Sequence, residues 1–162
     1  MKIKAISLMI FIFFPVALFA STATCPLSDG INVHTKKRTL NICKHGSVIK
    51  TFKVALGYKG VGKKQAGDNK TPIGLYRLAH PRKSNQFKVF IPILYPTSKQ
   101  LAAGYTGRDV GIHGPTQSSG LLNWLNNLPS STRGCIAVGK NNYIEYVANW
   151  VKANPGTKVL II

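Results

Sequence analysis

The chain has 162 residues, of which 22 are Lys or Arg and only four are Asp or Glu, giving a formal net charge of +18 at pH 7. Four scattered acids do not make a paired-carboxylate site, and no two histidines have the spacing of zinc ligands, so neither a glycosidase nor a zinc peptidase is expected. A positive field of this strength favours an anionic partner, although a basic surface can also serve solubility alone.

Residues 1–23 have the layout of a secretory signal peptide. Two lysines come first, residues 6–19 are apolar apart from one serine, and small residues follow from Ala20 to Ala23. The apolar stretch is shorter than the ~20 residues that span a bilayer. We therefore expect a cleaved leader, a periplasmic or secreted protein, and no stable membrane span once the leader is removed. An uncleaved anchor and a lipid anchor on Cys25 are the alternatives.

The cysteine count carries information about the compartment. An odd number, three, in an exported protein suggests one disulfide and one free thiol. Cys25 and Cys43 lie on either side of a predicted hairpin, so they can bond across it in an oxidising compartment and leave Cys135 alone. Alternatively, all three are reduced and structural. Residues 24–162 have the size of one domain with one core.

The first half of this domain is a series of predicted short strands. Residues 31–35 and 39–43 alternate with a period of two and flank a polar turn, which predicts a hairpin, and residues 48–54 predict a third strand. Residues 57–74 are rich in Gly, Lys and Asn and predict a long exposed loop. Further strands are predicted at residues 75–78, 88–94 and 110–113.

The C-terminal part adds helical patterns. Residues 121–125 predict one or two turns of helix. Apolar side chains from Tyr143 to Val151 recur at helical spacing, which predicts an amphipathic helix before Pro155, and residues 157–162 predict a buried closing strand. Together these elements predict a mainly β fold, a sandwich or partly closed barrel with one or two short helices and a C-terminal helix.

Two residues of the C-terminal half are suited to nucleophilic catalysis. A thiol attacks a carbonyl as the thiolate and so needs a nearby base, which makes Cys135 the candidate nucleophile and His113 its candidate base. Arg133 would stabilise the thiolate. Gly134 would let a substrate carbonyl approach and would free backbone N–H groups for an oxyanion hole. The alternative is an inert buried cysteine, the commoner fate of a free thiol.

Several segments in this order resemble the L,D-transpeptidase catalytic domain, the YkuD-like family of cysteine enzymes that act on peptidoglycan stem peptides. The predicted hairpin and third strand resemble the opening strands of that family. Gly67-Asp-Asn-Lys-Thr-Pro-Ile-Gly74 resembles its Thr-Pro-x-Gly turn, and Ile112-His-Gly114 its histidine motif. Thr132-Arg-Gly-Cys-Ile136 resembles its nucleophile motif, and residues 155–161 its final strand. The resemblance covers nearly all of residues 24–162.

The resemblance implies that the Cys135 thiol is acylated by substrate and that His113 takes its proton. It also implies a substrate and oxyanion site shaped by Gly114, Thr132, Arg133 and Gly134. The donor would be a tetrapeptide stem, attacked between its third residue, a diamino acid, and the terminal D-alanine. An amine resolves the thioester in transpeptidation and water does so in carboxypeptidase action. No metal and no organic cofactor is implied.

Two positions depart from the common pattern of the family. Arg133 stands where many members have histidine, and Ala137 where many have Asn or Arg. The Gly-Cys-Ile-Ala form, together with Gly67-Asp68, resembles a branch that includes hydrolases, one of which releases a wall-linked lipoprotein. The alternatives are therefore a hydrolase on the same fold, either an L,D-carboxypeptidase or an amidase, and a non-catalytic wall-binding module.

Two further expectations concern partners. Residues 117–129 are expected to cover the site and set which acceptor enters. No nucleic-acid partner is expected, because the chain is exported and no stacking aromatics alternate with its basic residues. A secreted basic toxin or nucleic-acid binder is the alternative, and it would bind DNA in a salt-dependent way without any role for the thiol.

Overall fold

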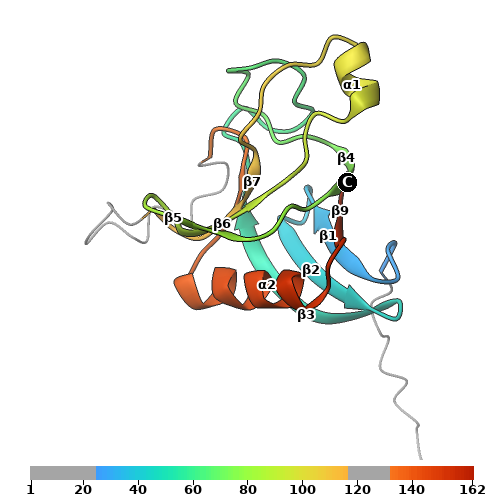
Figure 1. The fold of residues 1–162 in the computed structure, drawn as a ribbon, viewed down its shortest axis with the longest axis vertical. Coiled ribbons are helices and arrows are strands. Elements are labelled where there is room, and N and C mark those ends of the chain that lie inside the picture. The colour runs from blue at the N-terminus through green and yellow to red at the C-terminus, as the bar shows by residue number, and fades with distance from the viewer. Residues whose placement is uncertain (1–24, 117–131) are drawn as a thin grey trace, which may run out of the picture.

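Within residues 25–116 and 132–162, which the computed structural model describes, nine strands join in one curled sheet. The strand order is β4-β9-β1-β2-β3-β8-β7-β6-β5. The strands are β1 Gly30–His34, β2 Thr39–Lys44, β3 Ser47–Ala55, β4 Gly74–Arg77, β5 Arg82–Ser84, β6 Lys88–Pro92, β7 Gly111–His113, β8 Ile136–Val138 and β9 Lys158–Ile161. The helices are α1 Ser98–Ala102 and α2 Asn141–Ala153. The longer helix, α2, packs against the sheet, and the short helix α1 lies apart from it (Figure 1). The predicted mainly β fold with a C-terminal helix is confirmed.

The N-terminal hairpin forms the central part of the sheet. β1 and β2 pair antiparallel with Val33 opposite Leu40, and β3 continues the antiparallel order beside β2. The apolar residues that made the period-two pattern are fully buried, because alternate side chains of a strand point to the same face. β9 pairs parallel with β1, so the predicted closing strand is also confirmed. A disulfide joins Cys25 to Cys43 and leaves Cys135 as the free thiol.

The other half of the sheet differs from the prediction in three places. β5 and β8 have three residues each, too few for a hydrophobic period to show. α1 was not predicted either, although Thr97 and Gln100 form a capping box at its start, a pairing that the sequence contains. The strand predicted at residues 88–94 ends at Pro92; Ile93 forms only an isolated bridge with Leu78, and Leu94 is 50% exposed.

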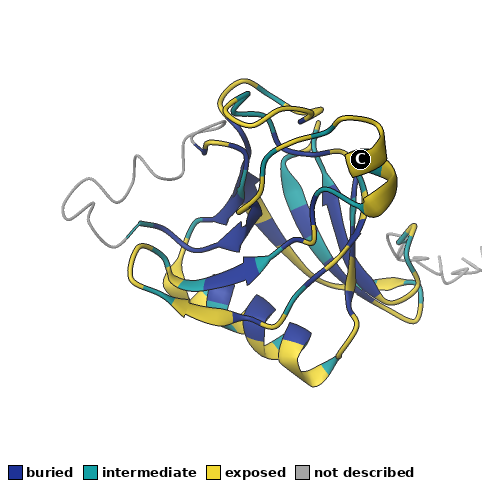
Figure 2. Cartoon of the chain, turned by 45° about the horizontal axis from the view of Figure 1, so that its top comes forward, coloured by how far each residue is buried: buried dark blue, intermediate teal, exposed yellow. Residues whose placement is uncertain are grey.

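The C-terminal helix closes the core. α2 packs against β6 and β8, with Ile144, Val147, Ala148 and Val151 buried on one stripe. Figure 2 shows this buried stripe turned toward the sheet and the exposed stripe turned outward. The helical spacing predicted from Tyr143 to Val151 is therefore confirmed, and α2 ends at Ala153, just before Pro155.

The segment between β3 and β4 was predicted to be a long exposed loop, and that prediction is wrong in part. Lys63 is only 6% exposed and Thr71 is 0% exposed. The composition of the segment suggested solvent, but its lysine is buried because an aspartate five positions later pairs with it. The predicted leader at residues 1–23, the helix at 121–125 and the covering segment at 117–129 lie outside the described residues. No helix in the described part of the chain is long and apolar enough to cross a membrane.

Candidate active site

The pairing of β7 with β8 brings the two candidate catalytic residues to one face of the sheet. His113 is the last residue of β7, and Cys135 immediately precedes β8. The two strands are parallel with His113 opposite Ala137. Because side chains alternate along a strand, Cys135 and Ala137 point to the same face, and the register puts His113 on that face too. All three line one pocket of about 640 Å³.

The imidazole of His113 is held in one orientation. Its Nδ1 lies 2.6 Å from the carbonyl oxygen of Gly114. A carbonyl oxygen only accepts, so the neutral ring carries its proton on Nδ1 and leaves Nε2 as an acceptor. The ring of Phe87 stacks on the imidazole with centroids 3.7 Å apart. Burial lowers the pKa of His113, and the Gly114 carbonyl opposes this less strongly. The ring is therefore neutral at neutral pH and suited to take a proton.

The thiol of Cys135 is also neutral at rest. Its Sγ lies 3.6 Å from the backbone carbonyl oxygen of Asp109, to which the thiol donates weakly. Burial raises the pKa of Cys135, and the backbone N–H of Gly111 and the ammonium of Lys63 only partly oppose it. The sequence did not suggest Lys63 for this role. Arg133 is exposed and lines the pocket, and its stabilisation of the thiolate stays a prediction.

Thr132 builds the turn that carries the nucleophile. Its backbone N–H donates to Leu56 at 3.1 Å, and its carbonyl accepts from Tyr58 at 2.8 Å, so the segment is anchored to the end of β3. Its hydroxyl donates to the carbonyl oxygen of Cys135 at 2.7 Å and accepts from the N–H of Gly134 at 3.1 Å. The predicted site residue Thr132 thus fixes the backbone on both sides of the thiol.

The two predicted site glycines are positions of close packing. Gly134 has φ +124°, and a Cβ there would lie 2.7 Å from the carbonyl oxygen of Lys70. A Cβ on Gly114 would lie 2.8 Å from the side chain of Ile144 in α2. Any other residue at either place would push the nucleophile turn or the histidine strand away from its support. Gly114, Thr132 and Arg133 line the pocket together with Cys135 and His113.

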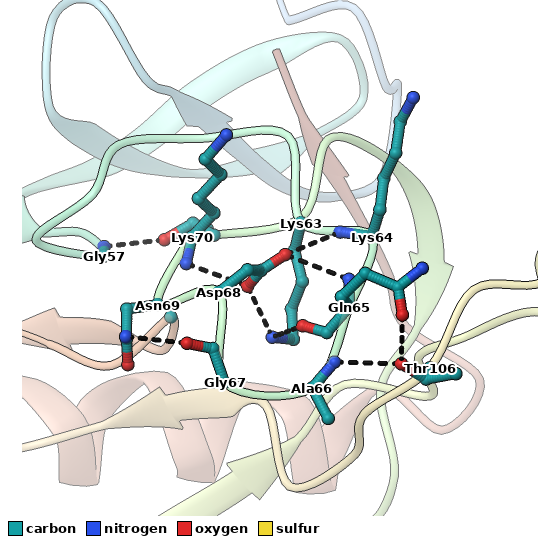
Figure 3. Close-up of polar contacts among 12 residues, drawn as sticks. Gly57, Lys63, Lys64, Gln65, Ala66, Gly67, Asp68, Asn69, Lys70 and Thr106 are labelled. Atoms are coloured by element: carbon teal, nitrogen blue, oxygen red, sulfur yellow. Dashed lines mark hydrogen bonds and ion pairs between the residues drawn. The ribbon is translucent and has the colours of Figure 1, made fainter.

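The loop behind Gly134 is organised by one carboxylate (Figure 3). Asp68 Oδ1 accepts from the ammonium of Lys63 at 2.8 Å and from the N–H of Lys70 at 3.1 Å. Its Oδ2 accepts from the N–H groups of Lys64 and Gln65 at 2.8 and 3.0 Å. Burial alone would raise the pKa of Asp68, but the bonds from Lys63 and these N–H groups outweigh it and hold the pKa well below its usual range.

One wall of the pocket was missed by sequence reasoning. The β5–β6 hairpin contributes five of the residues that line the pocket, namely Arg82, Ser84, Gln86, Phe87 and Phe90. These residues form no motif, and only strand pairing reveals their place, because β6 pairs with β7 and so lies beside the histidine. In the described residues no group of three His, Cys, Asp or Glu side chains is placed to hold a metal ion.

A mainly β fold that presents a free thiol and an imidazole to one pocket has the arrangement of an acyl-transfer enzyme with a cysteine nucleophile. The chain belongs to the YkuD family of L,D-transpeptidase catalytic domains, whose sequence profile matches residues 28–161. No curated protein matches the chain.

Solved structures share the fold. The helical cell shape determining protein Pgp2 from Campylobacter jejuni is 26% identical with a TM-score of 0.67, covering 81% of this chain and 46% of its own. Bd1075 from Bdellovibrio bacteriovorus is 22% identical with a TM-score of 0.59, covering 83% and 47%. The catalytic domain of the E. faecium L,D-transpeptidase is 16% identical with a TM-score of 0.56, covering 85% and 100%. The chain thus spans about half the length of the first two proteins and all of the third.

We expect Asp68→Asn to lower the free energy of unfolding by about 2–3 kcal/mol at pH 7, because it leaves the Lys63 ammonium buried without a counter-charge. The folded-state pKa of Asp68 lies below its unfolded value of 3.8, so its stabilisation is complete above that pH and is lost as the pH falls toward the folded-state pKa. Urea unfolding of the wild type and of Asp68→Asn should show that the difference between their free energies of unfolding becomes smaller below pH 3.8. Glu145→Gln, which removes a largely exposed ion pair with Lys88, is the control. A difference between wild type and Asp68→Asn that does not change with pH would contradict the role of the charge.

We expect iodoacetamide to alkylate Cys135 slowly at neutral pH in the folded protein. The rate should reach its maximum at a higher pH than in the urea-unfolded protein. The reason is that burial raises the pKa of the folded thiol. Intact-protein mass spectrometry measures the rate, and the unfolded chain with its disulfide intact is a matched control in which only Cys135 reacts. A folded-state rate that is already maximal near pH 7 would instead indicate a preformed thiolate–imidazolium pair.

Proposed function

We propose that the chain is a peptidoglycan-modifying cysteine acyltransferase, an L,D-transpeptidase that attacks the bond between the third residue and the D-alanine of a tetrapeptide stem. The observation that carries this proposal is the shared pocket of Cys135 and His113, in which the Gly114 carbonyl holds the proton on Nδ1 and leaves Nε2 as the base. Membership of the L,D-transpeptidase family supports the substrate class.

In the proposed reaction, Nε2 of His113 takes the proton of the Cys135 thiol as the sulfur attacks the stem carbonyl. The tetrahedral intermediate collapses when the imidazolium gives this proton to the departing amine of D-alanine, which leaves a thioester on Cys135. His113 then deprotonates an acceptor amine or a water, which attacks the thioester and returns the thiol. Both protons therefore pass through one imidazole, which suits a ring that is neutral at rest.

The developing oxyanion needs a donor beside the thiol. The N–H of Gly134 already donates to the Thr132 hydroxyl. The N–H of Cys135 itself has no acceptor among the described residues, and the β7–β8 register does not use it. We therefore assign the first oxyanion donor to the N–H of Cys135, with Thr132 and Gly134 keeping that group aimed at the pocket. Arg133, which lines the pocket, adds positive charge at the same end.

We propose that the protein works outside the cytoplasm as a single domain of residues 24–162, after a leader at residues 1–23 is removed. The disulfide between Cys25 and Cys43 supports this location, because such bonds persist in oxidising compartments. The likeness to Pgp2, a cell shape determining protein, supports a role in shaping the wall.

The second candidate is a hydrolase on the same fold, which cuts stem peptides or frees a wall-linked lipoprotein. The observation that favours it is Ala137, whose small side chain lies opposite His113 in the sheet and lines the pocket. A methyl group there leaves room beside the base, where a water can replace an acceptor amine. A wall-binding module without turnover is supported less, because it gives no role to the shared pocket of the thiol and the imidazole.

The test is to incubate the mature protein, residues 24–162, with disaccharide-tetrapeptide and with lipoprotein-linked muropeptide, and to identify the products by mass spectrometry. We expect crosslinked dimer or exchanged terminal D-amino acid, abolished in Cys135→Ala and slowed at least about 100-fold in His113→Gln. Tripeptide or freed muropeptide without exchange would assign hydrolysis. Activity that survives Cys135→Ala, or no change in either substrate, would overturn the cysteine mechanism for these substrates.

A further inference from the structure

An arginine of the unpredicted hairpin is held beside the candidate base. The strand register places Arg82 opposite Phe90 and Phe90 opposite His113, so the three side chains form a row across β5, β6 and β7. The guanidinium carbon of Arg82 lies 5.0 Å from the centroid of the Phe90 ring, and the Phe90 ring stacks toward His113 with centroids 6.4 Å apart. Arg82, Phe90 and His113 all line the pocket.

The chain offers Arg82 almost no internal counter-charge. It has four acidic side chains in all, and residues 117–131 contain none of them. Asp68 and Glu145 form the two ion pairs of the described residues, with Lys63 and Lys88. The carboxylate of Asp29 accepts hydrogen bonds from the Ser28 hydroxyl and the His45 backbone N–H, beside the N-terminal hairpin. Only one acid remains for the pocket.

That acid, Asp109, is at the other end of the pocket. Its carbonyl oxygen contacts the Sγ of Cys135, and Arg133 stands two residues before the same cysteine. The strand order puts Cys135 at β8 and Arg82 at β5, with the histidine strand between them. Asp109 lines the pocket too, but within the described residues no ion pair joins its carboxylate to Arg82 or to Arg133. Arg82 therefore has a positive charge at the pocket and no ion-pair partner in the described part of the chain.

We propose that Arg82 is a carboxylate-binding residue of this pocket and selects stem peptides that carry a free carboxylate close to the bond attacked by Cys135. The proposal rests on the function proposed above. A guanidinium that lies over an aromatic ring keeps its in-plane N–H donors free, and these match a carboxylate with two parallel hydrogen bonds. The Phe90 ring thus orients the donors of Arg82 before substrate arrives, which reduces the entropy lost on binding.

The spacing restricts which carboxylate can be bound. Neighbouring strands lie ~4.8 Å apart, so the backbone of Arg82 in β5 and that of Cys135 at the start of β8, three strands apart, are separated by about 14 Å. An extended peptide advances ~3.3–3.6 Å per residue, so a carboxylate held by Arg82 belongs within about four residues of the attacked bond. The terminal D-alanine carboxylate and a second carboxylate on the diamino acid both meet this condition.

The experiment measures binding by calorimetry in the Cys135→Ala background, so that no turnover consumes the ligand. Three synthetic tetrapeptide stems are compared: one with both carboxylates, one with a terminal carboxamide and one with the diamino acid amidated. We expect Arg82→Met to weaken binding of the first stem about 10- to 100-fold, as for a lost charge-assisted pair. One of the two amidated stems lacks the carboxylate that Arg82 binds, and Arg82→Met should leave the binding of that stem unchanged. This stem therefore identifies which of the two carboxylates Arg82 contacts.

Two matched variants complete the design. Arg82→Lys keeps the charge without the planar fork and should retain only part of the affinity. Arg77→Met removes an exposed arginine of β4 that does not line the pocket and should change nothing. Thermal unfolding of each variant checks that the fold is intact.

An equal loss for all three stems in Arg82→Met would mean that the residue adds only to the general positive field, and no loss would mean that it does not contact substrate. Either result overturns the carboxylate subsite and leaves the proposed function standing. If the Cys135→Ala protein binds none of the stems, the proposed function fails, and the subsite fails with it.

Discussion

The ion pair between Lys63 and Asp68 is the interaction on which the candidate site depends. A buried ammonium is tolerated only beside a counter-charge, and this carboxylate also gathers three backbone N–H groups, so it closes the loop into one conformation. The closed loop then presents the hydroxyl of Thr71 to the N–H of Gly57 and the carbonyl of Lys70 to the Cα of Gly134. The nucleophile turn is thus built against a surface that a single carboxylate holds in place.

The second constraint is desolvation of Cys135 and His113, the candidate catalytic pair. Burial raises the pKa of Cys135 and lowers that of His113, so both groups are uncharged before substrate enters. A neutral thiol exchanges slowly with disulfides, because the thiolate is the reactive form. In the proposed mechanism the thiol ionises only when His113 takes its proton, so Cys135 is protected from such exchange until substrate enters the pocket.

The sequence predicted those helices and strands that are long enough for their apolar residues to recur at a regular spacing. The hairpin, the third strand, α2 and the closing strand each repeat apolar residues often enough to show which face is buried. β5 and β8 are too short for that, and the loop of residues 57–74 was misjudged because composition cannot tell that Lys63 finds Asp68. Cys135 and His113 were selected for their chemistry and for the family resemblance. The wall that contains Phe87 became visible only through strand pairing, which no local pattern encodes.

The distribution of charge has consequences at two ranges. With 22 basic and four acidic side chains, the chain as a whole attracts anionic polymers, but at physiological salt such attraction between exposed charges fades beyond ~8 Å. A field of that kind concentrates the protein on any anionic polymer, including the wall of the proposed function, and does not distinguish one stem peptide from another. Discrimination needs a charge that is oriented, and the guanidinium of Arg82, which is exposed but lies over the Phe90 ring at the pocket, provides one. The scarcity of acids therefore has a local effect, because it leaves Arg82 without an ion-pair partner among the described residues and, in the proposed subsite, available to a carboxylate of the substrate.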